Sequence, residues 1–287
     1  MNLLMVECVD GLGYFGVLDF YVIQDILELY HPVLMCHARE VCRLFSKLLK
    51  PNRCTAVQLM KDGALRGSLE LCKLAKKCGC GDRGYTWMLM NAAQGGHEEL
   101  CRLAKTWGTI DYMWMGGISD YNWMLESAAE GGHKELCELA KAWGSIDYNR
   151  MLYSAARKGH KELCELAKTW GATKYNKMLA AAAHSGHIEL CELAKTWGAT
   201  DYNEMLEKAS WGGHWEICEL AKAWGATNYD VMLTEAALCG RKDICELAKA
   251  WGATDYDEMY ICAYQGGHTE ICELAKMWIK NLKSVQY

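Results

Sequence analysis

Apolar residues recur along most of this chain at the spacing of an amphipathic helix, and the pattern stops and restarts at glycines. After Tyr148, a first apolar stripe ends at Gly159 and consists of Met151, Leu152, Ala155 and Ala156. A second stripe ends at Gly171 and consists of Leu163, Cys164, Leu166, Ala167 and Trp170. These spacings place each stripe on one helix face, and glycine suits the position just after a helix end. The unit therefore predicts two short helices.

This unit is copied along the chain, and a recurring Gly-His pair marks each copy. The intervals are 27 residues for most copies, with the histidine at His133, His160, His187, His214 and His268. Arg241 takes the histidine's place in one copy, and Ser68 takes it in the first. His97 precedes the next histidine by 36 residues, which leaves an insertion in residues 109–120. We count eight copies.

Helices of about ten residues are not stable alone in water, so each pair must bury its apolar stripes against its neighbours. Aspartates stand where the first helix of several copies would be capped, at Asp147, Asp201 and Asp255. Only two prolines occur in 287 residues, which favours helix throughout. The predicted fold is all-α: an α-solenoid of about eight helix-turn-helix repeats over residues 57–278, followed by a tail over residues 279–287.

The repeat resembles the ankyrin repeat. The resemblance rests on Ala155-Ala156, Gly159-His160, Glu162 and Gly171-Ala172, which stand at matching offsets. Ankyrin repeats have about 33 residues, because a β-turn finger joins successive helix pairs. Here only residues 172–175 connect the pairs, so we expect ankyrin-like helix pairs without β-fingers.

Comparison of the copies separates constant positions from changing ones. In the first helix the changing positions are 150, 153, 154, 157 and 158 and their counterparts, which share one helix face. The ankyrin resemblance implies that this face lines a concave surface for a protein target. The candidate target-binding residues are Trp123, Arg150, Tyr153, Arg157, Lys177, His184, Glu204, Glu207, Trp211 and Glu258. Trp123, Tyr153, Trp211 and Trp215 are expected to be exposed, and aromatic residues dominate interface energies. The alternative is that the changing positions are merely solvated.

The second helix carries charges that hardly change between copies, represented by Glu162, Glu165 and Lys168. We interpret them as a solvated outer face with ion pairs between residues three apart.

Two recurring residue types could indicate chemistry. A cysteine stands at one position of every copy, for example Cys164 and Cys191, and a zinc site is the alternative to a small buried apolar residue. The cysteines of the copies form no CxxC pair, so burial is the better explanation. The repeated histidine at a helix start is best explained as a structural hydrogen-bonding group. No phosphate-binding loop or nucleophile motif is present. We therefore expect no enzyme activity and no cofactor.

Residues 1–56 do not follow the repeat and resemble an F-box. The resemblance rests on Ile26-Leu27, Pro32 and the run from Val41 to Phe45, whereas Asp19 stands where that family usually has proline. It implies binding to a Skp-type adaptor of a cullin–RING ubiquitin ligase. The docking or core residues would be Leu18, Ile23, Ile26, Leu27, Val41 and Phe45. The alternative is a helical cap that shields the first repeat. This combination of segments also resembles proteins encoded by large DNA viruses of amoebae.

Composition limits the class of protein. The net charge is −5, from 31 Lys plus Arg and 36 Asp plus Glu, so we do not expect a nucleic-acid partner. No apolar run is long enough to cross a membrane, and the first 20 residues lack the basic start of a secretory signal. Sixteen cysteines without such a signal favour free thiols in a reducing compartment. We expect a monomer in the cytoplasm, which would be the host cytoplasm if the protein is viral.

Overall fold

The computed structural model describes residues 53–108 and 120–285, which form sixteen helices and no strand. The helices form eight hairpins. The first helices are α3 (Arg53–Leu65), α5 (Gly81–Gly95), α7 (Asp120–Gly131), α9 (Tyr148–Lys158), α11 (Tyr175–His184), α13 (Tyr202–Gly212), α15 (Tyr229–Leu238) and α17 (Tyr256–Gln265). The second helices are α4 (Leu69–Lys77), α6 (Glu98–Trp107), α8 (Lys134–Ala142), α10 (Lys161–Thr169), α12 (Ile188–Thr196), α14 (Trp215–Trp224), α16 (Lys242–Ala250) and α18 (Thr269–Val285). The predicted all-α solenoid is confirmed.

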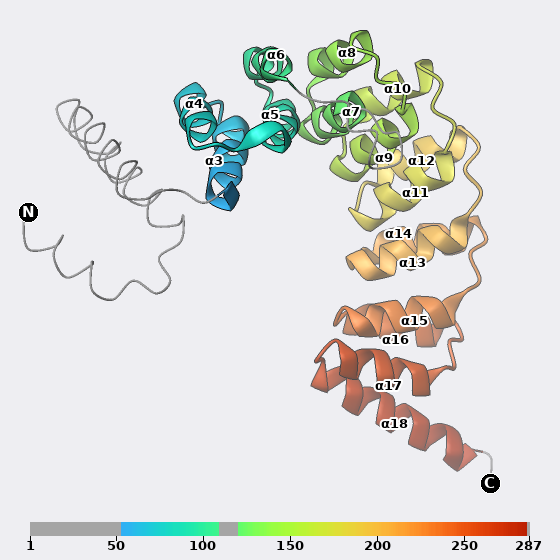
Figure 1. Ribbon diagram of the computed structural model, residues 1–287. Coiled ribbons are helices and arrows are strands. Elements are labelled where there is room, and N and C mark those ends of the chain that lie inside the picture. Colours follow the sequence, from blue (N-terminus) through green and yellow to red (C-terminus); the bar gives the residue numbers. More distant parts are fainter. Residues whose placement is uncertain (1–52, 109–119, 286–287) are drawn as a thin grey trace, which may run out of the picture.

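The hairpins stack side by side into an arch. Each first helix packs against its own second helix and against the first helix of the next hairpin. Figure 1 shows α3, α5 and α7 on the inner side of the arch and α4, α6 and α8 on the outer side. The candidate F-box residues and the insertion at residues 109–119 lie outside the described residues.

Side chains at the start of the first helices replace the β-finger of an ankyrin repeat. The predicted caps are confirmed: Asp201 accepts a hydrogen bond from the backbone N–H of Glu204 at 3.0 Å, and Asp147 and Asp255 do the same in their own copies. Asn176 reaches forward to the next linker, where its Oδ1 accepts the backbone N–H groups of Thr200 and Asp201 at 2.7 and 3.2 Å. The linker thus has its polar groups satisfied without a hairpin.

The core repeats the same few residues in every copy. Met151, Ala155 and Cys164 and most of their counterparts have no exposed surface. Burial raises the pKa of the Cys164 thiol to about 12, and the described cysteines are free. No cluster of ligands for a metal ion occurs among the described residues. The cysteine column is therefore a small apolar part of the core, as expected.

The repeated histidine ties each hairpin to the one before it. His160 Nε2 donates to the carbonyl oxygen of Glu130, the last-turn residue of the preceding first helix, at 3.1 Å. Six histidines make this contact at 3.0–3.2 Å. Each ring also lies against a glycine of the preceding turn: a Cβ on Gly132 would lie 2.8 Å from the ring of His160. The Gly-His pair is therefore a structural contact between neighbouring hairpins.

A second contact between hairpins was not expected from the sequence. Tyr175 and Trp197 of one hairpin pack edge to face at 5.6 Å. Lys168 of the preceding hairpin places its Nζ 4.4 Å from the Trp197 ring centroid. Seven lysines repeat this arrangement at 4.1–4.4 Å, with the ammonium group over an indole of the next hairpin.

The second helices present a solvated outer face, as expected, since Glu162, Glu165 and Lys168 are exposed. The expected ion pair between residues three apart is confirmed in α4, where Lys73 contacts Glu70 at 3.3 Å, and in α18, where Lys276 contacts Glu273 at 2.7 Å. It is wrong for Lys168, whose ammonium group lies over Trp197 instead. The last copy has no following tryptophan, so its lysine turns back to the carboxylate of its own helix.

The hairpin of α17 and α18 differs from the other hairpins at two positions of its first helix. Tyr260 and Tyr264 replace the buried leucine and the small residue of other copies, and their rings stack at 6.4 Å. α18 does not end at Trp278, where we placed the end of the solenoid, but continues to Val285. None of the described helices combines the length and the apolar character that crossing a membrane requires.

Candidate partner-binding surface

The ten candidate target-binding residues all lie on first helices, from α7 to α17. We call the changing positions of these helices the variable surface. Tyr153 and Trp211 are exposed, with 42% and 45% of their surface accessible, and Lys177 and Glu258 are also exposed. The others are half-buried: Trp123, Arg150, Arg157, His184, Glu204 and Glu207.

Two details of the predicted surface are wrong. Trp123 is only half-exposed, because the guanidinium group of Arg150 lies over its ring at 4.5 Å. Position 154 does not belong to the surface in every copy. Ser127, Ser154 and Ala181 are buried, because the neighbouring first helices pack over them.

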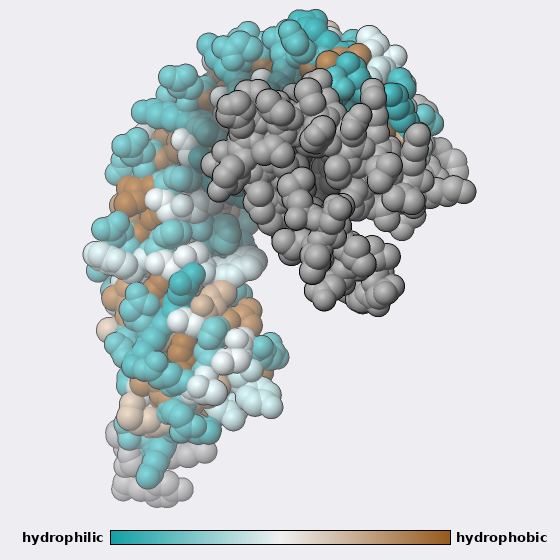
Figure 2. Space-filling model, turned by 90° about the vertical axis from the view of Figure 1, so that its left-hand side faces the viewer, coloured by the Kyte–Doolittle hydropathy of each residue, from teal (hydrophilic) through white to brown (hydrophobic). Residues whose placement is uncertain are grey.

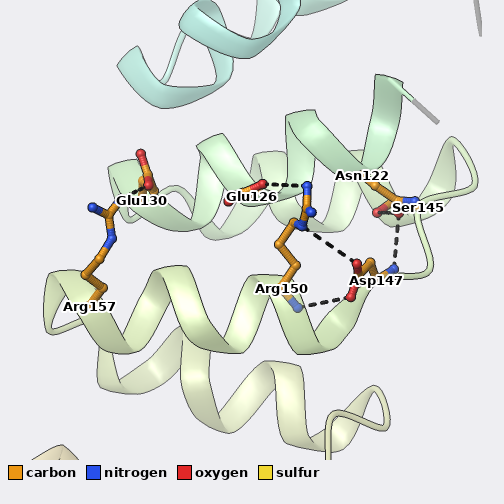
Figure 3. A network of polar contacts seen from close by, with 7 residues as sticks. All are labelled: Asn122, Glu126, Glu130, Ser145, Asp147, Arg150 and Arg157. Atoms are coloured by element: carbon orange, nitrogen blue, oxygen red, sulfur yellow. Dashed lines mark hydrogen bonds and ion pairs between the residues drawn. The ribbon is translucent and has the colours of Figure 1, made fainter. Parts of the chain in front are cut away.

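In the N-terminal part of the variable surface, charged side chains of α7 and α9 form ion pairs with each other (Figure 3). Arg150 contacts Glu126 at 3.2 Å and Asp147 at 3.8 Å, and Arg157 contacts Glu130. Burial raises the pKa of Glu126, although the Arg150 charge opposes the shift. Both arginines of α9 thus have partners within the solenoid.

The linker after α8 is fixed at the edge of the same network. Asn122 Oδ1 accepts the Ser145 hydroxyl at 2.8 Å and the backbone N–H groups of Ile146 and Asp147 at 2.9 and 3.1 Å. Asp147 therefore meets Arg150 from a fixed position (Figure 3). This arrangement can orient side chains for binding.

The central part of the variable surface, on α11 and α13, contains an ion pair and a pair of neighbouring aromatic side chains. Lys177 of α11 contacts Glu204 of α13 at 2.6 Å. The rings of His184 and Trp211, which occupy equivalent positions in these two helices, lie 5.1 Å apart. Trp215, at the start of α14, is 49% exposed, as expected.

The C-terminal part contains two apolar residues that we did not select from the sequence. Leu238 of α15 is 36% exposed and Ile261 of α17 is 44% exposed. Both stand in changing columns, at the positions of Arg157 and Tyr153. Their position in those columns was the available signal, but an aliphatic residue in a helix is usually buried.

Two shallow depressions lie on the outer side of the described hairpins. One of about 400 Å³ is lined by Glu219, Lys222, Ala223 and Trp251. Another of about 500 Å³ is lined by the equivalent residues Glu138, Lys141, Ala142 and Trp170. Both surround a lysine–tryptophan contact of the framework, so they follow from the repeat. The variable surface is the better candidate for binding.

Comparison with known proteins yields one kind of match. No protein-family model matches the chain, and no curated protein matches it in sequence. Solved structures do match, among them the crystal structure of the human ASB11 ankyrin repeat domain. That structure shares 18% sequence identity with this chain and has a TM-score of 0.42. The match covers 58% of this chain and 84% of the other.

Proposed function

We propose that this protein is a non-enzymatic scaffold that binds a protein target on its variable surface. The proposal rests on one observation: the constant residues of the repeat hold the solenoid together, whereas most of the changing residues lie on its surface. The constant residues contact one another or a neighbouring hairpin: the methionine, leucine, alanine and cysteine of the core, the histidine and the lysine–tryptophan pair. The residues that change share one side of the first helices and include exposed Tyr153 and Trp211. Exposed aromatic side chains are typical of binding surfaces.

We further propose that the solenoid recruits its target to a ubiquitin ligase. The support is the F-box-like motif of residues 1–56, whose last docking residue, Phe45, precedes Arg53 at the start of α3 by eight residues. Eight residues span at most about 28 Å. An adaptor bound to Phe45 would therefore stay close to the N-terminal end of the arch, and the target would be held along its inner side.

Calorimetry with a purified Skp-type adaptor tests this role. The full chain is compared with a Leu27→Asp, Val41→Asp double variant. A matched control, Ile146→Asp, places the same charge on a linker residue that is 75% exposed. We expect binding at micromolar or lower Kd for the natural chain and the control, and its loss in the double variant while thermal unfolding is unchanged.

The absence of adaptor binding to the natural chain would refute the ligase role. The remaining function would be a passive or sequestering scaffold whose residues 1–56 cap the solenoid. The exposed variable surface supports both functions equally, because a target would bind to it in either case.

A further inference from the structure

The charges of the variable surface change sign between the middle and the C-terminal hairpins. At the changing positions, α9 and α11 carry four cations, Arg150, Arg157, Lys158 and Lys177, and no carboxylate. At the same positions, α13, α15 and α17 carry a single cation, Lys208, and four carboxylates: Glu204, Glu207, Glu235 and Glu258. The variable surface of the C-terminal hairpins therefore has an excess of negative charge.

Contacts within the solenoid neutralise only part of this charge. Lys177 pairs with Glu204, and Lys208 pairs with Glu207 at 2.7 Å. No ion pair reaches Glu235 or Glu258 in the part of the chain that the structure describes. Burial and the nearby charge of Glu207 raise the pKa of Glu235, and the weaker effect of Lys208 does not offset them. A cation supplied from outside would relieve this repulsion.

Apolar side chains are exposed beside these carboxylates. Trp211 and Leu238 occupy the same position in consecutive first helices, and Ile261 follows in α17. Figure 2 shows brown apolar groups among teal hydrophilic ones on the C-terminal hairpins, in the lower part of the view. Apolar groups that gather on a surface and are rimmed by polar residues are typical of protein interaction sites.

We propose that α13, α15 and α17 bind a basic, apolar peptide segment of the target protein, with lysine or arginine side chains at Glu235 and Glu258 and apolar side chains at Trp211, Leu238 and Ile261. This inference rests on the proposed scaffold function and specifies where and what the scaffold binds. Complementary charge decides the occupant: an anionic membrane, a nucleic acid or an acidic peptide would be repelled by the four carboxylates of this surface. Neighbouring helices pack about 10 Å apart, so a segment across three hairpins needs to span about 20 Å.

A selection with random peptides tests the inference. A displayed library of 16-residue peptides is selected against the full chain, and the enriched peptides are synthesised. Their Kd is measured by fluorescence anisotropy at two salt concentrations. Two double variants change the surface: Glu235→Gln with Glu258→Gln, and Trp211→Ser with Leu238→Ser.

Control variants make the same kinds of substitution elsewhere on the molecule. Glu219→Gln with Glu246→Gln removes two carboxylates from the outer helices α14 and α16, and Tyr153→Ser changes the N-terminal part of the variable surface. We expect enriched peptides that combine lysine or arginine with large apolar residues. Their Kd should rise by about tenfold or more in each surface variant, weaken with salt, and stay within about twofold in the controls.

The other outcomes separate the two proposals. Peptides that lose affinity only with Tyr153→Ser, or that are not basic, would overturn this inference and leave the scaffold function supported. Peptides insensitive to every variable-surface substitution, or no enrichment at all, would overturn both. Circular dichroism of each variant identifies any loss of binding that comes from unfolding.

Discussion

Replacing Gly159 with alanine tests whether the glycine–histidine contact between hairpins stabilises the solenoid. Gly159 has a φ of +82°, and an added Cβ would lie 2.8 Å from the His187 ring. Gly267, at the equivalent position of the α17 hairpin, has a φ of +76° with nothing within 4 Å of an added Cβ. Both substitutions cost the strain of a left-handed alanine, about 1–2 kcal/mol. Only Gly159→Ala also forces the ring aside, which costs a further 1–3 kcal/mol or so.

Urea unfolding followed by circular dichroism measures these differences. We expect Gly159→Ala to lower the free energy of unfolding by about 2–5 kcal/mol and Gly267→Ala by about 1–2 kcal/mol. His187→Ala alone loses the hydrogen bond to the Arg157 carbonyl, worth about 1 kcal/mol. In the His187→Ala background, Gly159→Ala no longer has a ring to displace, so it should cost only the backbone strain. The two substitutions should therefore show a coupling energy of about 1–3 kcal/mol. Equal effects of the two glycine substitutions, or no coupling to His187, would refute the reasoning.

Three further predictions concern the other repeated contacts. Lys168→Met should lower the free energy of unfolding by about 0.5–1 kcal/mol through loss of its contact with an indole, and Lys276→Met, which faces no following tryptophan, should cost less in the same urea titration. Asn176→Ala should cost about 1–3 kcal/mol, because two backbone N–H groups of the next linker lose their acceptor, and an unchanged urea midpoint would count against this role. Burial raises the pKa of the Cys164 thiol to about 12, so at pH 8 the folded protein should protect it from iodoacetamide far longer than half-buried Cys239. Mass spectrometry measures the alkylation of each cysteine, and equal alkylation would contradict the burial of Cys164.

Local patterns were sufficient to predict the fold. The helical stripes, the glycines after each helix and the capping aspartates act within one hairpin, and the short linker excludes a β-finger. The structure confirms the helices, the caps and the linkers. The histidine's structural role was predicted because a residue repeated in nearly every copy is a poor candidate for catalysis.

Contacts between hairpins were harder to predict. Lys168 and Trp197 are far apart in sequence and meet only when two hairpins stack, so the lysine resembled an ordinary solvated charge. Ser154 changes between copies like a surface residue, yet the neighbouring first helices bury it. Leu238 and Ile261 stand in changing columns, and their exposure agrees with that placement, but their aliphatic side chains kept them out of the selected residues. Exposure depends on neighbouring hairpins, which a comparison of copies does not include.

A saturation scan of stability tests most directly the claim that the constant positions build the solenoid and the variable surface serves binding. Every single substitution in α7–α17 would be displayed and scored for protease resistance. The account predicts that changes at Met151, Ala155 and Cys164 and their counterparts lower resistance, whereas polar replacements of Trp211, Leu238 and Ile261 leave it unchanged or raise it. Equal losses at both sets of positions would contradict the account, because the exposed apolar residues would then be required for folding rather than for a partner.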